Sequence, residues 1–148
     1  MYKHILVPID GSKLALKAAK EAAALAKNLK ARITALYVIA PFMPRASDGY
    51  ISPFNGALAR RYKEATQKVA AQALEKVGKA AAGVKVRCDQ VAVTNDQPWA
   101  GIVKAARERK CDVIVMGSHG RGGLASLLLG SETQKVLTHS KTPVLVCR

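Results

Sequence analysis

Aromatic residues are scarce in this chain of 148 residues: they make up 5% of it, whereas hydrophobic residues make up 49%. A core with so few rings must be built from Ala, Val, Leu and Ile. That composition suits a central sheet covered by Ala-rich helices better than an aromatic β-sandwich. The length is that of one ordinary domain, and we expect residues 1–148 to form a single one.

Cysteine and long apolar runs are scarce as well. Cys88, Cys111 and Cys147 lie far apart among strand-forming residues, with no CxxC pair and no His at zinc-finger spacing. We therefore expect three reduced, mostly buried thiols. No apolar run approaches the roughly 20 residues of a membrane-spanning helix, and residues 1–9 show no secretory cleavage pattern. The sequence predicts a cytoplasmic protein without a membrane span.

Acidic residues are few: 10 Asp and Glu stand against 24 Lys and Arg, which gives a formal net charge of +14. Such an excess attracts anions of every kind, including nucleotides, nucleic acids and acidic membrane surfaces. The lysines of the first predicted helix recur at helical spacing opposite an apolar stripe, as on a solvated face. No basic run is interleaved with aromatics as on a single-strand-binding surface. We do not expect nucleic acid as a partner, although the charge alone is compatible with it.

Apolar runs alternate along the chain with segments of helical periodicity. Strands are predicted at residues 4–9, 31–40, 84–93, 111–116 and 142–147, and helices at 57–82 and 124–140. Two further helices are predicted, one after Ser12 with apolar positions from Ala15 to Leu29 and one from Pro98 with Trp99 to Ala106 facing inward. Residues 41–56 contain three Pro and two Gly and are predicted to form a functional or mobile loop. Strands that alternate with helices predict an α/β fold, with a mostly parallel sheet covered on both faces.

Two segments follow predicted strands at the edge where parallel sheets bind ligands. One is Asp10-Gly11-Ser12, and the other is the glycine-dense run 117–123. Glycine N–H groups and the N-terminus of a following helix can together hold an anion. A Walker loop is excluded because no Lys separates Gly130 from Ser131. A dinucleotide fingerprint is discounted because no acidic residue follows at about 20 positions.

The spacing Gly117-x2-Gly120-x9-Gly130-Ser131, with the opening run 5–12 and the closing run 143–146, resembles the universal stress protein family, and its ATP-binding branch in particular. The resemblance spans essentially the whole chain. It implies an open five-stranded parallel sheet of order 3-2-1-4-5, of the adenine nucleotide alpha hydrolase-like kind, and a homodimer joined through the last strand. It also implies ATP, ADP or AMP, with Mg²⁺, in the cleft between the first and fourth strands.

The resemblance further implies individual roles. Asp10 would recognise the adenine or the ribose, and Val38 would meet the base through its backbone. The residues that would line the base are Pro8 and Ile9. Those that would border the ribose and phosphates are Met116, Gly117, His119 and Gly120. Those that would surround the phosphate tail are Gly130, Ser131, Glu132 and Thr133, and Arg121 could offset phosphate charge. Glu132 departs from the small or apolar residue that many members carry, and its carboxylate could repel phosphate or hold a divalent metal.

Three functions remain open from the sequence. The first is a nucleotide-binding stress or regulatory protein, in which the nucleotide is a ligand with little or no turnover. The second is a weak ATPase in which His119 or Glu132 positions water. The third is a structural stress dimer that binds polyanions through its +14 charge. No Walker lysine or paired catalytic base is visible, which favours the first. Asp10 has the alternative role of a helix cap, and His119 that of a polar loop residue.

Overall fold

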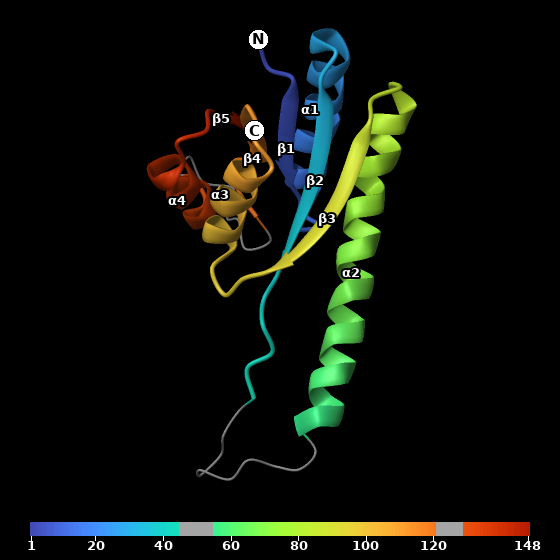
Figure 1. Cartoon of the computed structure of the whole chain (residues 1–148), viewed down its shortest axis with the longest axis vertical. Helices are drawn as coiled ribbons and strands as arrows, with labels where there is room; N and C mark the ends of the chain where they lie inside the picture. The colour runs from blue at the N-terminus through green and yellow to red at the C-terminus, as the bar shows by residue number, and fades with distance from the viewer. Residues whose placement is uncertain (45–54, 121–128) are drawn as a thin grey trace.

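The computed structural model describes residues 1–44, 55–120 and 129–148 (Figure 1). Strands and helices alternate along the chain, as the hydrophobic pattern predicts. The elements are β1 (His4–Pro8), α1 (Lys13–Leu29), β2 (Arg32–Ile39), α2 (Asn55–Gly83), β3 (Cys88–Thr94), α3 (Pro98–Glu108), β4 (Val113–Gly117), α4 (Ser131–His139) and β5 (Val144–Cys147).

All five strands run parallel in one sheet of order β3-β2-β1-β4-β5. The expected order is therefore confirmed. β1 lies in the middle, and its residues Ile5, Leu6 and Val7 have no solvent exposure. This burial on both faces explains why the strand is a continuous apolar run rather than an alternating one.

Helices cover both faces of the sheet, as predicted. α1 and α2 pack on one face, where alanines of α1 meet Ile5 and Val7 of β1. α3 and α4 pack on the other, where Ile102 and Val136 meet Leu6. Small alanine side chains let α1 lie close to the sheet, and this close packing compensates for the shortage of aromatic residues. Among the described helices, none is both long enough and apolar enough to cross a membrane.

Two elements begin more than two residues later than predicted, whereas the other boundaries agree to within two residues. The last helix begins at Ser131, and Leu129 and Gly130 are not helical, whereas the predicted residues 124–128 lie outside the described ranges. Gly130 is extended (φ −61°, ψ 149°) and forms the N-cap of α4. β3 begins at Cys88 rather than at residue 84, because residues 84–87 form the turn that ends α2. Of the predicted loop 41–56, residues 45–54 lie outside the described ranges.

Three helix-to-strand turns share one geometry. α1, α2 and α3 each end in a turn with a lysine at positive φ: Lys30 (52°), Lys85 (61°) and Lys110 (53°). In each turn the N–H of the next residue donates to a carbonyl in the last helical turn at 2.9 Å, as Ala31 to Ala26, Val86 to Ala81, and Cys111 to Ala106. This is the Schellman motif, whose left-handed position is usually glycine. All three lysines lie at the edge of the sheet where the strands begin.

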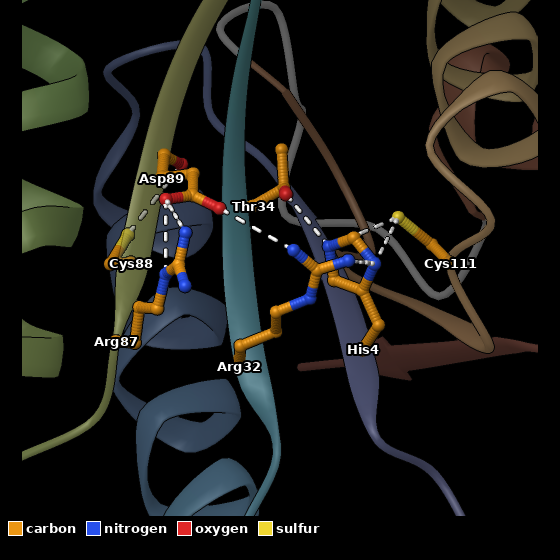
Figure 2. A network of polar contacts seen from close by, with 7 residues as sticks. All are labelled: His4, Arg32, Thr34, Arg87, Cys88, Asp89 and Cys111. Carbon is orange, nitrogen blue, oxygen red and sulfur yellow. Dashed lines mark hydrogen bonds and ion pairs between the residues drawn. The ribbon is translucent and has the colours of Figure 1, made fainter.

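A buried histidine, the first residue of β1, lies at the same edge of the sheet. His4 is 5% exposed, and its Nε2 lies 2.8 Å from Oγ1 of Thr34. Nη2 of Arg32 lies 3.1 Å from Nδ1, so Nδ1 must accept and Nε2–H must donate to the threonine. The Cys111 thiol lies beside the same ring (Figure 2). Burial and the Arg32 cation both lower the pKa of His4 below its ordinary value.

The three cysteines, all within the described residues, are free thiols. Cys111 and Cys147 are buried, and Cys88 is half-buried, as expected. Desolvation raises the pKa of Cys111 to about 11 and, aided by Glu21, that of Cys147 to about 12. These thiols are therefore protonated at neutral pH and act as small core residues.

Candidate functional site

A cleft of about 880 Å³ opens at the carboxyl ends of β1, β2 and β4. Strands on either side of β1 connect to helices on opposite faces, and ligands bind parallel sheets at such a switch point. Twelve of the thirteen predicted site residues line the cleft: Pro8, Ile9, Asp10, Val38, Met116, Gly117, His119, Gly120, Gly130, Ser131, Glu132 and Thr133. The thirteenth, Arg121, lies outside the described residues.

The turn after β1 presents one carboxylate to this cleft. Oδ1 of Asp10 accepts a hydrogen bond from Ser12 N at 2.9 Å, across Gly11, which has a φ of 87°. The N-cap of α1 is Ser12, whose Oγ accepts from Ala15 N at 3.1 Å. Asp10 therefore shapes the turn before the cap, and its Oδ2 lies 2.7 Å from the place of a Cβ on Gly120. The side chain is thus positioned by the backbone rather than used as the cap.

The two glycine segments of the motif meet in space. Gly130 N donates to Ser118 O at 2.8 Å, and Ser118 N donates to Cys147 O at 2.8 Å. A Cβ on Gly130 would lie 3.1 Å from Cα of His119 and 3.2 Å from Ser118 O. Both neighbours are backbone atoms, so glycine is the residue that fits this approach without displacement. Oγ1 of Thr133 fixes the same corner by donating to Gly117 O at 3.0 Å.

Three helices begin at the cleft, and their N-terminal N–H groups differ in what they bind. Ser12 caps α1. The carboxylate of Glu132 caps α3, because its Oε2 accepts from Trp99 N at 2.9 Å. α4 begins after Gly130, and no side-chain cap bond from its N-cap residue is present in the described structure. The first-turn residues Ser131, Glu132 and Thr133 line the cleft, so the positive end of the α4 dipole lies at the cleft, where it favours an anion.

The sequence suggested that the Glu132 carboxylate repels phosphate or holds a divalent metal, but in the structure it binds other protein groups. Besides Trp99 N, it pairs through Oε1 with Nζ of Lys135 at 3.2 Å. Both oxygens are thus engaged, one in joining α4 to α3 and one along α4. Within the described ranges, no group of three or more His, Cys, Asp and Glu side chains could hold a metal ion.

Comparison with known sequences identifies the family of the chain. The sequence profile of the universal stress protein family matches residues 1–148. The chain belongs to this family. Its five-stranded parallel sheet is the adenine nucleotide alpha hydrolase-like fold that its structural relatives share.

Individual relatives of this universal stress protein align with almost its whole length. A universal stress protein of Thermus aquaticus is 35% identical over 148 residues and is covered over its full length, as is this chain. The solved structure of the protein MJ0577, from Methanocaldococcus jannaschii, superposes with a TM-score of 0.75 at 32% identity, covering 99% of this chain and 96% of that one. A universal stress protein crystallised in complex with cAMP is 25% identical, with a TM-score of 0.71 and coverage of 99% and 97%.

Sequence reasoning missed one wall of the cleft in this universal stress protein. Tyr62, Thr66 and Val69 of α2 line it, and the Tyr62 hydroxyl donates to Ala40 O at 2.8 Å. The ring of Tyr62 also lies 5.5 Å from that of Phe42. Figure 1 shows why: the N-terminal part of α2 extends past the end of the sheet. Helical periodicity in the sequence puts Tyr62 and Val69 on one face of α2, but no pattern in the sequence indicates that this face borders the cleft.

Proposed function

We propose that this universal stress protein binds an adenine nucleotide, with the phosphates at the N-terminus of α4. The observation that carries the proposal is the difference among the three helix N-termini at the cleft. Side chains cap α1 and α3, whereas the N-cap of α4 is a glycine and the first-turn residues Ser131, Glu132 and Thr133 line the cleft. Backbone N–H groups and a helix dipole that converge on an open site are suited to phosphate.

The opposite end of the cleft suits a base and a ribose. Pro8, Ile9 and Leu36 provide apolar walls, and Val38 borders the cleft at the end of β2. Strand-end backbone groups there can read the base, and the carboxylate of Asp10 can accept from ribose hydroxyls. A volume of about 880 Å³ lies within the usual range of small-molecule pockets. The relative crystallised with cAMP supports an adenosine-containing ligand.

Mg²⁺ would arrive with the nucleotide. Mg²⁺ prefers oxygen ligands and is commonly held by one or two carboxylates together with substrate phosphates. The described cleft offers two carboxylates, and those of Asp10 and Glu132 already hold backbone N–H groups. Asp10 borders the glycine segment at Gly120 and is the residue that would contact a phosphate-bound ion. The ion would neutralise phosphate charge in a site whose described lining contains no Lys or Arg.

We further propose that the nucleotide acts as a ligand that alters a homodimer or its partner. β5 is an edge strand, and its Leu145 is 47% exposed. An apolar edge strand is a hazard unless another chain covers it. Because Ser118 N donates to Cys147 O, the end of β5 is bonded to the turn that carries His119 and Gly120. Changes in the nucleotide site can therefore reach the dimer edge.

A titration of nucleotide-stripped protein tests the proposal. Mg-ATP, ADP, AMP, cAMP and GTP are titrated in a calorimeter at physiological salt, and phosphate release is measured in parallel. We expect saturable binding of adenine nucleotides, weaker binding of GTP and little release of phosphate. Equal affinity for every polyanion, lost on adding salt, would support the polyanion-binding alternative instead. Rapid phosphate release would support the ATPase alternative.

A further inference from the structure

A second cavity, of about 310 Å³, lies at the edge of the sheet opposite to the nucleotide cleft. It is formed where α1 ends before β2 and where α2 ends before β3. Its lining is unusual in charge: four of its seven residues are cationic and none is acidic. The lining residues are Ala26, Lys27, Lys30, Ala31, Lys85, Val86 and Arg87.

Two of the four cations occupy backbone positions that disfavour them. Lys30 and Lys85 have φ values of 52° and 61°, in the left-handed position of a Schellman motif where glycine fits without strain. A cation near a helix C-terminus interacts favourably with the helix dipole. A cation can interact with the helix dipole from an unstrained position in the last helical turn, as Lys27 does, so this interaction does not require the left-handed position. The two cations therefore occupy these positions at a conformational cost, as Lys110 does in the equivalent turn outside the cavity.

The lysines of this cavity have no acidic partners in the described part of the chain. No described carboxylate pairs with Lys27, Lys30 or Lys85, although ion pairs form elsewhere on the same helices, as between Lys79 and Glu75. Arg87 is paired at 3.4 Å with Asp89, and the other oxygen of that carboxylate lies 3.7 Å from Arg32 (Figure 2). One carboxylate is thus shared by two guanidinium groups, and the cavity keeps a net positive charge.

We propose that this cavity binds an oligophosphate, that is, two or three linked phosphate groups of a small molecule. Four solvent-exposed cations line one concave space, so a compact anion of high charge could interact with several of them at once. Lys ammonium groups bind phosphate as point charges, and Arg87 can bind it through its planar fork. The small volume suits a short phosphate chain better than a segment of nucleic-acid duplex. The site is independent of the nucleotide cleft, which lies at the other ends of the strands.

The test uses inorganic tripolyphosphate as the probe and three variants that each remove one lysine from the same type of turn. Lys30→Gly and Lys85→Gly alter the cavity, whereas Lys110→Gly alters an equivalent turn that does not line it. Titrations are run on the full chain at physiological salt, with Mg-ATP titrated separately. Because each glycine occupies a left-handed position, the melting temperature should not fall in any of the three.

We expect saturable binding of tripolyphosphate to the wild type. The affinity should fall about fivefold or more in Lys30→Gly and in Lys85→Gly, and should stay unchanged in Lys110→Gly. Mg-ATP affinity should be unaltered in all three. An equal loss in Lys110→Gly would overturn the proposal in favour of diffuse surface charge. Unchanged tripolyphosphate affinity in both cavity variants would place the anion elsewhere. No binding by the wild type, or binding of duplex DNA alone, would also overturn it.

Discussion

Oδ2 of Asp10 lies 2.7 Å from the place that a Cβ on Gly120 would occupy. The two residues come from opposite halves of the chain and from the ends of neighbouring strands, β1 and β4. Their proximity means that a carboxylate lies directly against the backbone of the glycine segment. A site for the ribose and phosphates of a nucleotide requires this kind of junction between an acceptor and backbone donors.

Replacing Gly120 with alanine should weaken nucleotide binding more than it weakens the fold. The new Cβ would displace the Asp10 carboxylate, which is the end of a short side chain and can shift. We expect a loss of stability below about 1 kcal/mol and a fall in ATP affinity of about tenfold. Calorimetric titration and thermal melting measure the two effects. Gly83→Ala is the matched control, because a Cβ there meets nothing within 4 Å; an equal loss of affinity in both variants would refute the role of Asp10.

Two substitutions of Glu132 should separate its effect on stability from its effect on nucleotide affinity. Glu132→Ala leaves Trp99 N without its acceptor and Lys135 without its partner, so we expect a loss of about 1 kcal/mol in the free energy of unfolding. Glu132→Gln keeps an acceptor oxygen and should stay close to the wild type in stability. Because it removes a negative charge from the cleft lining, it should raise the affinity for ATP relative to AMP by a few fold. An unchanged ratio would mean that the carboxylate has no electrostatic effect on the phosphates.

The buried His4 should make the fold less stable in mild acid. Its pKa is lowered in the folded state, chiefly by burial and then by the Arg32 cation. Its contribution is therefore fully present above the ordinary value of 6.5 and is lost as the pH falls through the lower folded pKa. Protonation of Nδ1 would also break the contact with Arg32. Thermal melts between pH 7.5 and 5 should show a smaller decline in His4→Gln than in the wild type, and equal declines would contradict this account.

The proposed dimer should depend on the edge strand. Leu145 is 47% exposed on β5, so Leu145→Asp should cost the monomer little stability and should prevent the pairing of two edges. Light scattering after size-exclusion chromatography measures the mass of each species. Leu137→Asp, at an exposed position on α4, is the control. A wild type that is monomeric at all concentrations, or a variant that remains dimeric, would rule out assembly through β5.

Much of the fold could be predicted because burial leaves a direct trace in the sequence. The apolar run of β1 reflects burial on both faces, and the repeated alanines of α1 reflect its contact with the sheet. The glycine spacing of the motif likewise reflects a backbone approach, since Gly130 lies against Ser118 and His119. In each case the burial or close backbone approach constrains residues that are near one another in the sequence, so a short stretch is enough to predict it.

The remaining features depend on contacts between distant segments. No local pattern shows that Glu132 would cap α3 through Trp99 N, or that Tyr62 would border the cleft. The start of α4 was misplaced because a glycine N-cap resembles the glycine-dense turn before it. The left-handed conformation of the three lysines was not predicted because lysine rarely adopts it, whereas glycine in the same position would have indicated it.

The most direct test compares calorimetric titrations of Mg-ATP into the wild type and Gly130→Asp. An aspartate at this position would crowd the backbone of His119 and Ser118 and place a negative charge at the N-terminus of α4. Circular dichroism establishes beforehand that the variant is folded. We predict saturable binding in the micromolar range by the wild type and none by the folded variant. Equal binding by both, or no binding of any adenine nucleotide by the wild type, would contradict a nucleotide site at the N-terminus of α4.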